Sequence, residues 1–201
     1  MRSIQKVVAV CALAMAGLAM APVAASAAGD ATPAGKAAAG AHGLTVQPNG
    51  YATLAAGRSY FIVQHSGKCL NVWNASQDSG AGLIQWPCQP AGSGNDEYVV
   101  TRVGSSIYHT IQAAHSGKCL DVYDASTSPG AGLIQWDCNG QANQQFAFRV
   151  PDVNRPAYVE IVPRHSGLTL DVYNASQDNG AGVIQWNRNG QSNQLWYWGV
   201  L

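Results

Sequence analysis

The side chains that could do covalent chemistry are few in this sequence, and their spacing does not suit catalysis. The two glutamates, Glu97 and Glu160, do not belong to a repeated pair, so the two carboxylates that a glycosidase places across a bond have no obvious candidates. His-Ser-Gly occurs three times, at 65–67, 115–117 and 165–167. A threefold metal site is one interpretation, but Ser-Gly is typical of tight surface turns. We predict a protein that is not an enzyme and needs no metal or cofactor.

The N-terminus predicts export. Arg2 and Lys6 flank the start of an apolar, Ala-rich stretch over 7–23, and residues 25–27 are small, as at a cleavage site. We expect a signal peptide over 1–27, rather than a membrane anchor, and a secreted, extracellular mature chain. No other segment is apolar enough to span a bilayer.

The charges balance, with 11 Lys+Arg against 11 Asp+Glu. Nucleic-acid binding needs clustered cations, and a neutral chain has no electrostatic attraction to an anionic membrane. We therefore expect no nucleic-acid partner and no membrane insertion.

A unit of 50 residues occurs three times. The segment Gly-Ala-Gly-Leu-Ile-Gln-Trp at 80–86 recurs at 130–136 and, with Val for Leu, at 180–186. Between residues 65–88 and 115–138, 17 of 24 positions are identical. Repetition is therefore the first property that any fold must explain.

Each unit has the hydrophobic pattern of short strands. Residues 120–123 alternate apolar and polar side chains, 133–136 follow a Gly-Ala-Gly turn, and 146–148 and 158–162 are two further candidates. A propeller needs at least four blades, so three units predict an all-β fold, a β-trefoil barrel with pseudo-threefold symmetry. We place it at 58–201, after a flexible Ala/Gly/Pro-rich leader over 28–57 in which Tyr51 and Leu54 could dock.

The repeat also selects a disulfide pairing. Besides Cys11 in the signal there are four cysteines, and an even number in an exported chain favours disulfides. Cys69–Cys88 and Cys119–Cys138 have the same spacing, so a threefold fold places the two pairs equivalently. Each closes a loop of about 20 residues, worth about 3 kcal/mol in the chain-entropy model. The third unit has Thr169 and Arg188 there and lacks the bond.

These motifs resemble those of the ricin-B-type lectins, also called R-type lectins, whose modules also accompany xylan-degrading enzymes. The residues that carry the resemblance are Cys-Leu-Asp-Val at 119–122, Trp-Asp-Cys at 136–138, Asn-Gln-Gln-Phe at 143–146, Leu-Asp-Val at 170–172, Ile-Gln-Trp at 184–186 and Asn-Gln-Leu-Trp at 193–196. The resemblance covers about residues 58–201.

The resemblance implies a shallow sugar pocket in each repeat. In the family an Asp accepts hydrogen bonds from adjacent hydroxyls, an aromatic residue 15 positions later stacks on the pyranose, and an Asn-Gln pair completes the polar contacts. The matching residues are Asp121, Ile134, Trp136, Asn143 and Gln144 in the second unit, Asp171, Ile184, Trp186, Asn193 and Gln194 in the third, and Asn71, Trp86, Asn95 and Asp96 in the first.

The chemistry of these residue types agrees with the resemblance. A neutral sugar offers hydroxyls and C–H groups; a carboxylate makes charge-assisted hydrogen bonds and an indole gives a large rigid contact. Two alternatives stay open: the tryptophans could be core residues, and Gln144 and Gln194 could bond the backbone inside the fold. Asn74-Ala75-Ser76 and Asn174-Ala175-Ser176 fit the glycosylation sequon, although Asx-type turns explain them as well.

The first unit departs from the pattern. Asn71 replaces the Asp, Asp96 replaces the Gln of the Asn-Gln pair, and the loop from Trp86 to Asn95 is two residues longer than its equivalents. We expect weakened or altered binding there.

The sequence therefore predicts a secreted, monomeric lectin for neutral sugars, of galactose type or xylan/arabinan type, with single sites of about millimolar affinity. Several sites on one body would act together on a polymer, alone or beside a glycan-degrading enzyme. The alternative is an inhibitor or toxin accessory on the same scaffold, because fold does not determine function.

Overall fold

The computed structural model describes residues 43–92 and 94–201. The predicted signal peptide and residues 28–42 of the predicted leader lie outside the described residues. In the part that is described, no helix has the length and hydrophobicity needed to cross a membrane.

Six strands close into an antiparallel barrel. Each strand pairs with two neighbours in the cyclic order β3, β6, β7, β10, β11, β14 and back to β3. Closure leaves no free edge in this ring. Their bounds are β3 Gly57–Val63, β6 Tyr98–Arg102, β7 Tyr108–Ala113, β10 Phe146–Arg149, β11 Tyr158–Pro163 and β14 Trp196–Val200.

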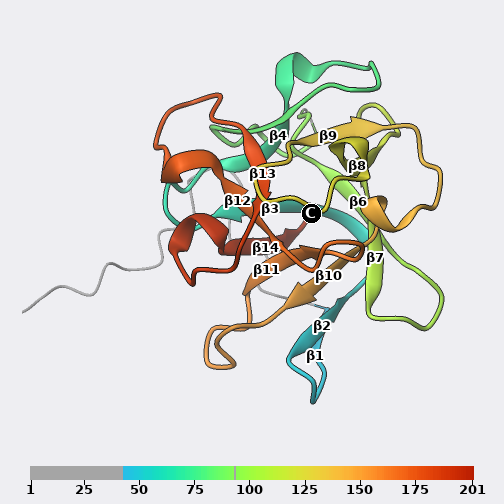
Figure 1. The fold of residues 1–201 in the computed structure, drawn as a ribbon, viewed down its shortest axis with the longest axis vertical. Coiled ribbons are helices and arrows are strands. Elements are labelled where there is room, and N and C mark those ends of the chain that lie inside the picture. The colour runs from blue at the N-terminus through green and yellow to red at the C-terminus, as the bar shows by residue number, and fades with distance from the viewer. Residues whose placement is uncertain (1–42, 93) are drawn as a thin grey trace, which may run out of the picture. The chain divides into compact units, whose positions relative to one another are not determined.

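Three hairpins, one from each repeat, complete the fold (Figure 1). Their registers are equivalent: Asn71, Asp121 and Asp171 pair with Ile84, Ile134 and Ile184. The barrel and hairpins confirm the predicted β-trefoil. The hairpin strands are β4 Cys69–Val72 with β5 Leu83–Trp86, β8 Cys119–Val122 with β9 Leu133–Trp136, and β12 Thr169–Val172 with β13 Val183–Trp186; the 3-10 turns are η1 Trp73–Ala75, η2 Tyr123–Ala125, η3 Ala142–Gln144, η4 Tyr173–Ala175 and η5 Ser192–Gln194.

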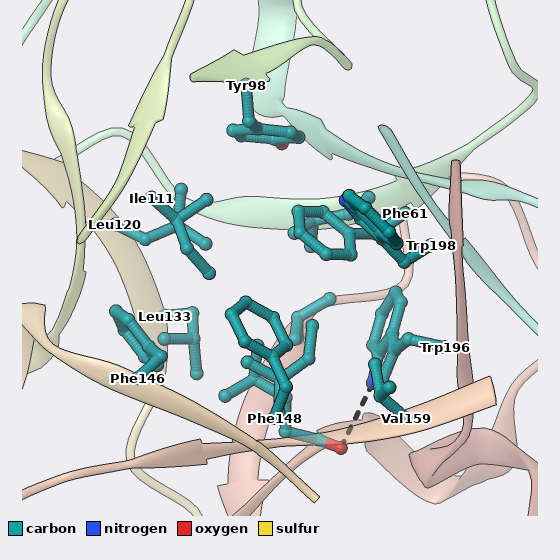
Figure 2. Packing of buried hydrophobic residues seen from close by; sticks show 14 of the residues in the cluster. Phe61, Tyr98, Ile111, Leu120, Leu133, Phe146, Phe148, Val159, Trp196 and Trp198 are labelled. Carbon is teal, nitrogen blue, oxygen red and sulfur yellow. Dashed lines mark hydrogen bonds between the residues drawn. The ribbon is translucent and has the colours of Figure 1, made fainter. Parts of the chain in front are cut away.

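The barrel interior is filled by aromatic and branched side chains (Figure 2). Phe61 and Phe148 stack with ring centroids 6.0 Å apart. Phe146 and Trp196 are fully buried. In β8, Leu120 points into this core.

The chain enters the domain earlier than predicted. Strands β1 (Leu44–Val46) and β2 (Tyr51–Leu54) form a hairpin, and β2 pairs with β10. Ala52 and Leu54 are buried. The assignment of residues 43–57 to a flexible leader is therefore corrected: the alternation of residues 51–54 marked a strand that the surrounding Ala and Gly obscured.

Both predicted disulfides are present, Cys69–Cys88 and Cys119–Cys138. In the third repeat an ion pair occupies the equivalent place. Arg188 Nε donates to both carboxylate oxygens of Glu160, at 2.8 and 2.9 Å, and Arg149 donates to Oε2 at 3.0 Å. The other glutamate, Glu97, binds Arg58 at 3.0 Å. Both glutamates are thus engaged in ion pairs of the scaffold.

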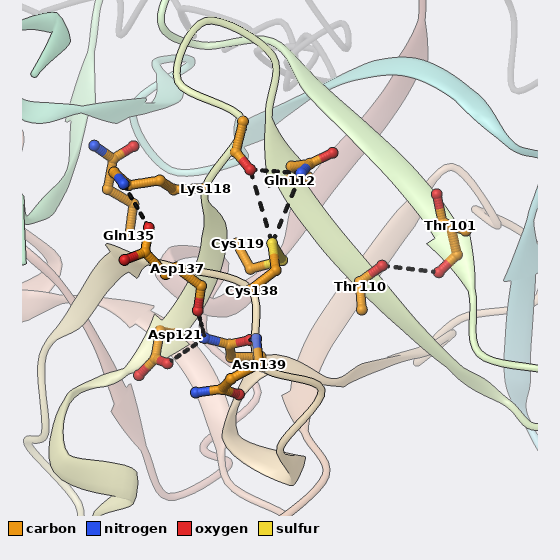
Figure 3. Close-up of a disulfide and its surroundings, with 12 residues drawn as sticks. Thr101, Thr110, Gln112, Lys118, Cys119, Asp121, Gln135, Asp137, Cys138 and Asn139 are labelled. Carbon is orange, nitrogen blue, oxygen red and sulfur yellow. Dashed lines mark hydrogen bonds and ion pairs between the residues drawn. A yellow bond between two sulfur atoms is a disulfide. The ribbon is translucent and has the colours of Figure 1, made fainter. Parts of the chain in front are cut away.

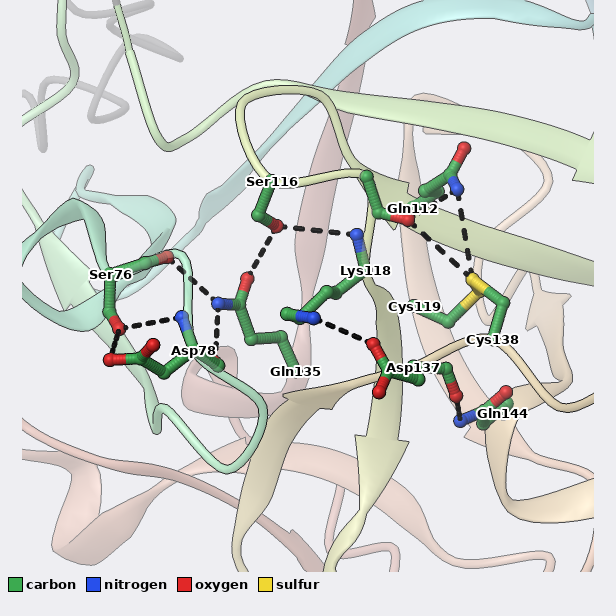
Figure 4. Close-up of polar contacts among 11 residues, drawn as sticks. Ser76, Asp78, Gln112, Ser116, Lys118, Cys119, Gln135, Asp137, Cys138 and Gln144 are labelled. Atoms are coloured by element: carbon green, nitrogen blue, oxygen red, sulfur yellow. Dashed lines mark hydrogen bonds and ion pairs between the residues drawn. A yellow bond between two sulfur atoms is a disulfide. The ribbon is translucent and has the colours of Figure 1, made fainter.

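Three buried glutamines fasten the repeats to one another. Gln135 Nε2 donates to the carbonyls of Ser76 and Asp78 in the preceding repeat, at 2.8 and 2.9 Å, and its Oε1 accepts from Ser116 at 2.7 Å (Figure 4). Gln185 and Gln85 make the same three bonds. The three amides therefore form a closed cycle of contacts around the trefoil.

The same contacts between repeats, which we call seams, explain the His-Ser-Gly motifs. The serine is the partner of the buried glutamine, and the Nε2 atoms of His65, His115 and His165 bond the carbonyls of Ser176, Ser76 and Ser126 in a neighbouring repeat, at 2.8–3.0 Å. The histidines thus bind three separate carbonyls, as turn hydrogen bonding predicts and a shared metal site does not.

We predict that Gln135→Ala lowers the free energy of unfolding by about 2–4 kcal/mol, since it removes three hydrogen bonds between buried groups, those with the Ser76 and Asp78 carbonyls and with the Ser116 hydroxyl. Urea unfolding of the full chain measures this. Thr127→Ala is the control, because Thr127 is exposed and its loss should cost less than about 0.5 kcal/mol. Equal effects of the two substitutions would show that the buried amide is not a fastener.

A second prediction concerns His109, which lies under the β1–β2 hairpin. Its Nε2 accepts a hydrogen bond from the Leu54 backbone N–H at 3.3 Å, and burial, with the nearby Arg102 charge, lowers its pKa from 6.5 to about 4. The unfolded chain therefore binds the proton more readily, and stability should fall as the pH drops from 6.5 towards 4. His109→Gln should flatten this part of the curve of unfolding free energy against pH; an unchanged slope would contradict the assignment.

Candidate functional site

An open cavity lies beside the hairpin of each repeat. The volumes are about 380, 410 and 220 Å³ in the first, second and third repeats. The second cavity is lined by Asp121, Tyr123, Asp124, Ala125, Ile134, Trp136, Asn139, Gln141 and Asn143, and the third by Asp171, Tyr173, Asn174, Ala175, Ile184, Trp186, Asn189, Gln191 and Asn193. The structure thus brings together four of the five predicted residues in each of these repeats.

The carboxylate in the second cavity is held by two amides. Asp121 is directed away from the core by strand alternation. Asn143 Nδ2 donates to its Oδ1 at 2.9 Å and Gln144 Nε2 to its Oδ2 at 2.8 Å. Figure 3 shows Asp121 close to Asn139, on the strand that begins at Cys119 of the disulfide. The carboxylate is thereby fixed in direction, with lone pairs left to accept from a ligand.

Gln144 is an orienting residue and does not line the cavity. It is fully buried, and besides Asp121 it bonds the Asp137 carbonyl at 2.9 Å and accepts from the Asn139 N–H at 2.9 Å. Gln194 repeats these contacts with Asp171, Asn187 and Asn189. The alternative in which Gln144 and Gln194 bond the backbone inside the fold is therefore the one observed.

The tryptophans at the equivalent position of the three repeats are exposed. The exposed fractions of Trp86, Trp136 and Trp186 are 38%, 43% and 41%, which excludes a role in the core. The edge of Trp136 lies against Gly80 of the preceding repeat, with Cζ3 3.6 Å from the position of a Cβ on that glycine, and Trp186 lies in the same way against Gly130. Each indole therefore bridges two repeats and keeps one side open to the cavity.

A second aromatic wall was not predicted. Tyr123 and Tyr173 line the cavities and are 61% and 54% exposed. They stand two positions after the Asp, and Trp73 takes the same position in the first repeat. This recurrence of an aromatic residue was the signal that could have identified them.

The turn after each of these aromatics has a left-handed backbone. Asp124 and Ala125 have φ values of 56° and 47°, and the pairs at 74–75 and 174–175 are equivalent. Asn and Asp tolerate this region, but an alanine there costs about 1 kcal/mol. Backbone conformation thus accounts for Asn74 and Asn174, the two sequon asparagines, and the strain falls on residues that line the cavities.

In the first repeat, Asn71, Trp86 and Asn95 line the cavity together with Trp73, Asn74, Ala75, Ile84 and Gln89. Asp96 does not. It is buried, and its Oδ2 accepts from the Gln89 N–H at 2.9 Å. This cavity has no carboxylate among its lining residues.

Burial raises the pKa of Asp121 and of Asp171, while the amides of Gln144 and Asn143, or Gln194 and Asn193, and the charges of His165 and His65 oppose the shift. Desolvation is the largest cause in both. Each carboxylate therefore lies in a partly apolar cavity, which we call a cup, and this burial disfavours the ionised form of the carboxylate.

A family model for the ricin-type beta-trefoil lectin domain-like family matches this chain three times, at residues 45–136, 94–186 and 142–199. The chain belongs to this lectin family. The ricin-type lectin fold is in general non-catalytic, and lectin relatives bind glycans. No curated protein matches the chain.

Solved structures support the assignment. The designed threefold-symmetric protein ThreeFoil is 42% identical, with a TM-score of 0.66, over 72% of this lectin-family chain and 99% of its own. An exo-β-1,3-galactanase from Clostridium thermocellum is 32% identical, with a TM-score of 0.65, over 72% of this chain and 30% of its own. The Macrolepiota procera ricin B-like lectin, solved with lactose, is 17% identical over 74% of this chain and 99% of its own, with a TM-score of 0.59, and shows the fold alone.

We predict that Asp121→Asn leaves the free energy of unfolding at pH 7 within about 1 kcal/mol of wild type. The ionised Asp121 opposes folding because its pKa is raised, and this offsets the hydrogen bonds from Asn143 and Gln144 that the variant weakens. Relative to the variant, the wild type should lose stability as the pH rises above 3.8. Urea unfolding from pH 3 to 7 measures both effects. If the free energy of unfolding of the variant does not rise relative to that of the wild type as the pH increases, the desolvation argument is contradicted.

Proposed function

We propose that this protein is a secreted carbohydrate-binding lectin whose second and third repeats each bind one neutral pyranose unit. The observation that carries the proposal is the carboxylate of Asp121, fixed by two amides at 2.8 and 2.9 Å beside the exposed Trp136 and Tyr123. The third repeat has the same set in Asp171, Trp186 and Tyr173.

The polar and apolar halves of the cup correspond to the two halves of a pyranose. Hydroxyls on adjacent ring carbons donate to the free lone pairs of the carboxylate, and charge-assisted hydrogen bonds of this kind are the stronger class. The C–H face of the ring packs on the indole. Asn143 and Asn193 line the cups as further hydrogen-bonding groups.

Each cup is small and open, so we expect single-site affinities of about millimolar, near −4 kcal/mol. Two such cups on one rigid body raise the apparent affinity for a polymer well above that of either cup. A polysaccharide or a glycan-covered surface is therefore the partner that this arrangement favours, bound by a monomer.

The match to part of a galactanase favours a galactose-containing polymer, with xylan or arabinan as the other candidates from the sequence. The chain corresponds to 30% of that enzyme's length, which supports action beside a glycan-degrading enzyme. Two disulfides are typical of proteins in oxidising compartments, and with the N-terminal sequence they support secretion.

We predict that Asp121→Asn combined with Asp171→Asn abolishes retention on a galactose-type or xylan matrix, with the affinity for a soluble oligosaccharide reduced at least about 10-fold, because charged hydrogen bonds contribute about 1.5–3 kcal/mol each. Affinity electrophoresis and calorimetry measure the two effects.

Asp152→Asn is the matched control, since Asp152 is exposed and lines none of the three cavities. Thermal unfolding verifies that both proteins are folded. Undiminished binding by the folded double variant would refute the assignment of the two cups. Absence of binding by wild type to galactosides, xylan and arabinan would instead favour the interaction-protein alternative.

A further inference from the structure

Four Asn-Gly pairs occur in the chain, at 49–50, 139–140, 179–180 and 189–190. The side-chain amide of an asparagine is open to attack by the backbone nitrogen of the next residue, and a glycine hinders this attack least because it has no side chain. Two of the four pairs belong to the proposed cups, since Asn139 and Asn189 line the second and third cavities. Both asparagines are exposed, so water reaches them.

The four pairs differ in whether the glycine nitrogen is already engaged. Outside the cups, the N–H groups of Gly50 and Gly180 each donate to a backbone carbonyl at 2.9 Å. In the cups, the N–H groups of Gly140 and Gly190 have no hydrogen-bond acceptor among residues 43–92 and 94–201. A nitrogen whose N–H is bound must give up that bond before it can attack, so the two pairs in the cups are the more reactive ones.

The carbonyl that receives the attack is polarised by a backbone donor. Asn139 Oδ1 accepts from the Gln141 N–H at 2.9 Å, and Asn189 Oδ1 has the equivalent contact at 2.8 Å. Attack makes this oxygen negative, and a fixed donor aimed at it lowers the barrier, as in an oxyanion hole. Asn49 Oδ1 also accepts such a bond, from the Tyr51 N–H at 3.1 Å, so the pair at 49–50 is a matched control with a bound glycine nitrogen.

The first repeat has no such pair in its cavity. Gln89 stands at the position of Asn139, because its N–H donates to Asp96 Oδ2 as that of Asn139 donates to Gln144 Oε1. Gln89 is followed by Pro90, and a proline nitrogen carries no hydrogen and cannot attack in this way. Among the three cavities, the reaction is therefore available in the two that contain a carboxylate.

We propose that Asn139 and Asn189 are sites of spontaneous deamidation, which modifies both cups as the protein ages. The Gly140 nitrogen loses its proton to hydroxide and forms a bond to Cγ of Asn139, and the Cγ–Nδ2 bond breaks with release of ammonia. Water then opens the cyclic imide at either of its carbonyls and leaves aspartate or isoaspartate. Water is the co-reactant, and nothing is oxidised or reduced. The same step takes place at Asn189 with the Gly190 nitrogen.

Either product changes the cup. Asn139 lies close to Asp121 in the second cavity (Figure 3), so a carboxylate at residue 139 opposes the charge of Asp121. Isoaspartate also adds a carbon to the backbone between residues 139 and 140, next to the N–H that bonds Gln144. Because Gln144 orients Asp121, the change reaches the carboxylate. A loss of sugar binding on ageing rests on the proposed function, whereas the deamidation itself does not.

The test follows the full chain during incubation in warm, mildly alkaline buffer. Peptide mapping by mass spectrometry measures the deamidated fraction at each of the four pairs, and labelling with an isoaspartyl methyltransferase identifies the isoaspartate. We expect Asn139 and Asn189 to react at least about 3-fold faster than Asn49 and Asn179, the factor that a hydrogen bond to the glycine nitrogen imposes. Equal rates at the four pairs, or faster reaction at Asn49 or Asn179, overturn the inference.

A glycine variant tests the attacking nitrogen. Gly140→Ala with Gly190→Ala should slow the reaction in both cups to no more than the rate at Asn49, because the added methyl group hinders the approach. A Cβ at either position meets no atom within 4 Å, so the cost is limited to the left-handed backbone at φ values of 75° and 74°. Thermal unfolding verifies the fold, and an unchanged rate in the folded variant overturns the inference.

An aspartate variant tests the consequence for binding. Asn139→Asp with Asn189→Asp reproduces one product and should weaken binding to the galactose-type or xylan matrix at least about 3-fold, and aged wild type should lose binding in step with its deamidated fraction. Full affinity of both proteins overturns the effect on the cups. If fresh wild type binds neither matrix while Asn139 and Asn189 react as expected, the proposed function fails and the deamidation sites stand.

Discussion

The structure depends on a buried amide at each seam between repeats. A single trefoil repeat cannot bury its own hairpin, so the polar backbone at the seams needs partners from elsewhere in the chain. Gln85, Gln135 and Gln185 provide them, each with two donor hydrogens to one repeat and an acceptor oxygen to its own serine. A primary amide suits this position because it offers two donors and an acceptor without a charge. The cycle closes after three steps, so three copies are needed and no seam is left open.

The cups follow from these seams. The residue after each buried glutamine is the tryptophan, and strand alternation points it outward where the glutamine points inward. The adjacent Gln and Trp of each repeat therefore have two roles: the Gln holds neighbouring repeats together, and the Trp forms one wall of a cup. The left-handed turn at 124–125 and its two equivalents form another part of the rim. Because these positions are held by hydrogen bonds and by backbone geometry, little ordering remains to be done when a ligand binds.

Much of this could be predicted from the sequence, because repetition converts spacing into geometry. Equal spacing sufficed to pair Cys69 with Cys88 and Cys119 with Cys138. The side to which a strand residue points followed from alternation, as for Asp121. The burial of a residue outside the strands could not be predicted in this way. Gln144 lies in a 3-10 turn, which has no sequence period that reveals its buried face, and Asp96, at the equivalent position, is buried as well. The β1–β2 hairpin was missed because the alternation at residues 51–54 is short and lies in Ala- and Gly-rich sequence that resembles a linker.

The contact of each indole with a glycine of another repeat means that every cup belongs to two repeats. The cup of Asp171 needs Gly130, that of Asp121 needs Gly80, and that of Asn71 needs Gly180. Loss of one repeat therefore damages a neighbour's cup as well as removing its own. For the proposed sugar sites, deletion of one repeat therefore alters two cups, whereas a substitution such as those at residues 71 and 96 alters one cup alone.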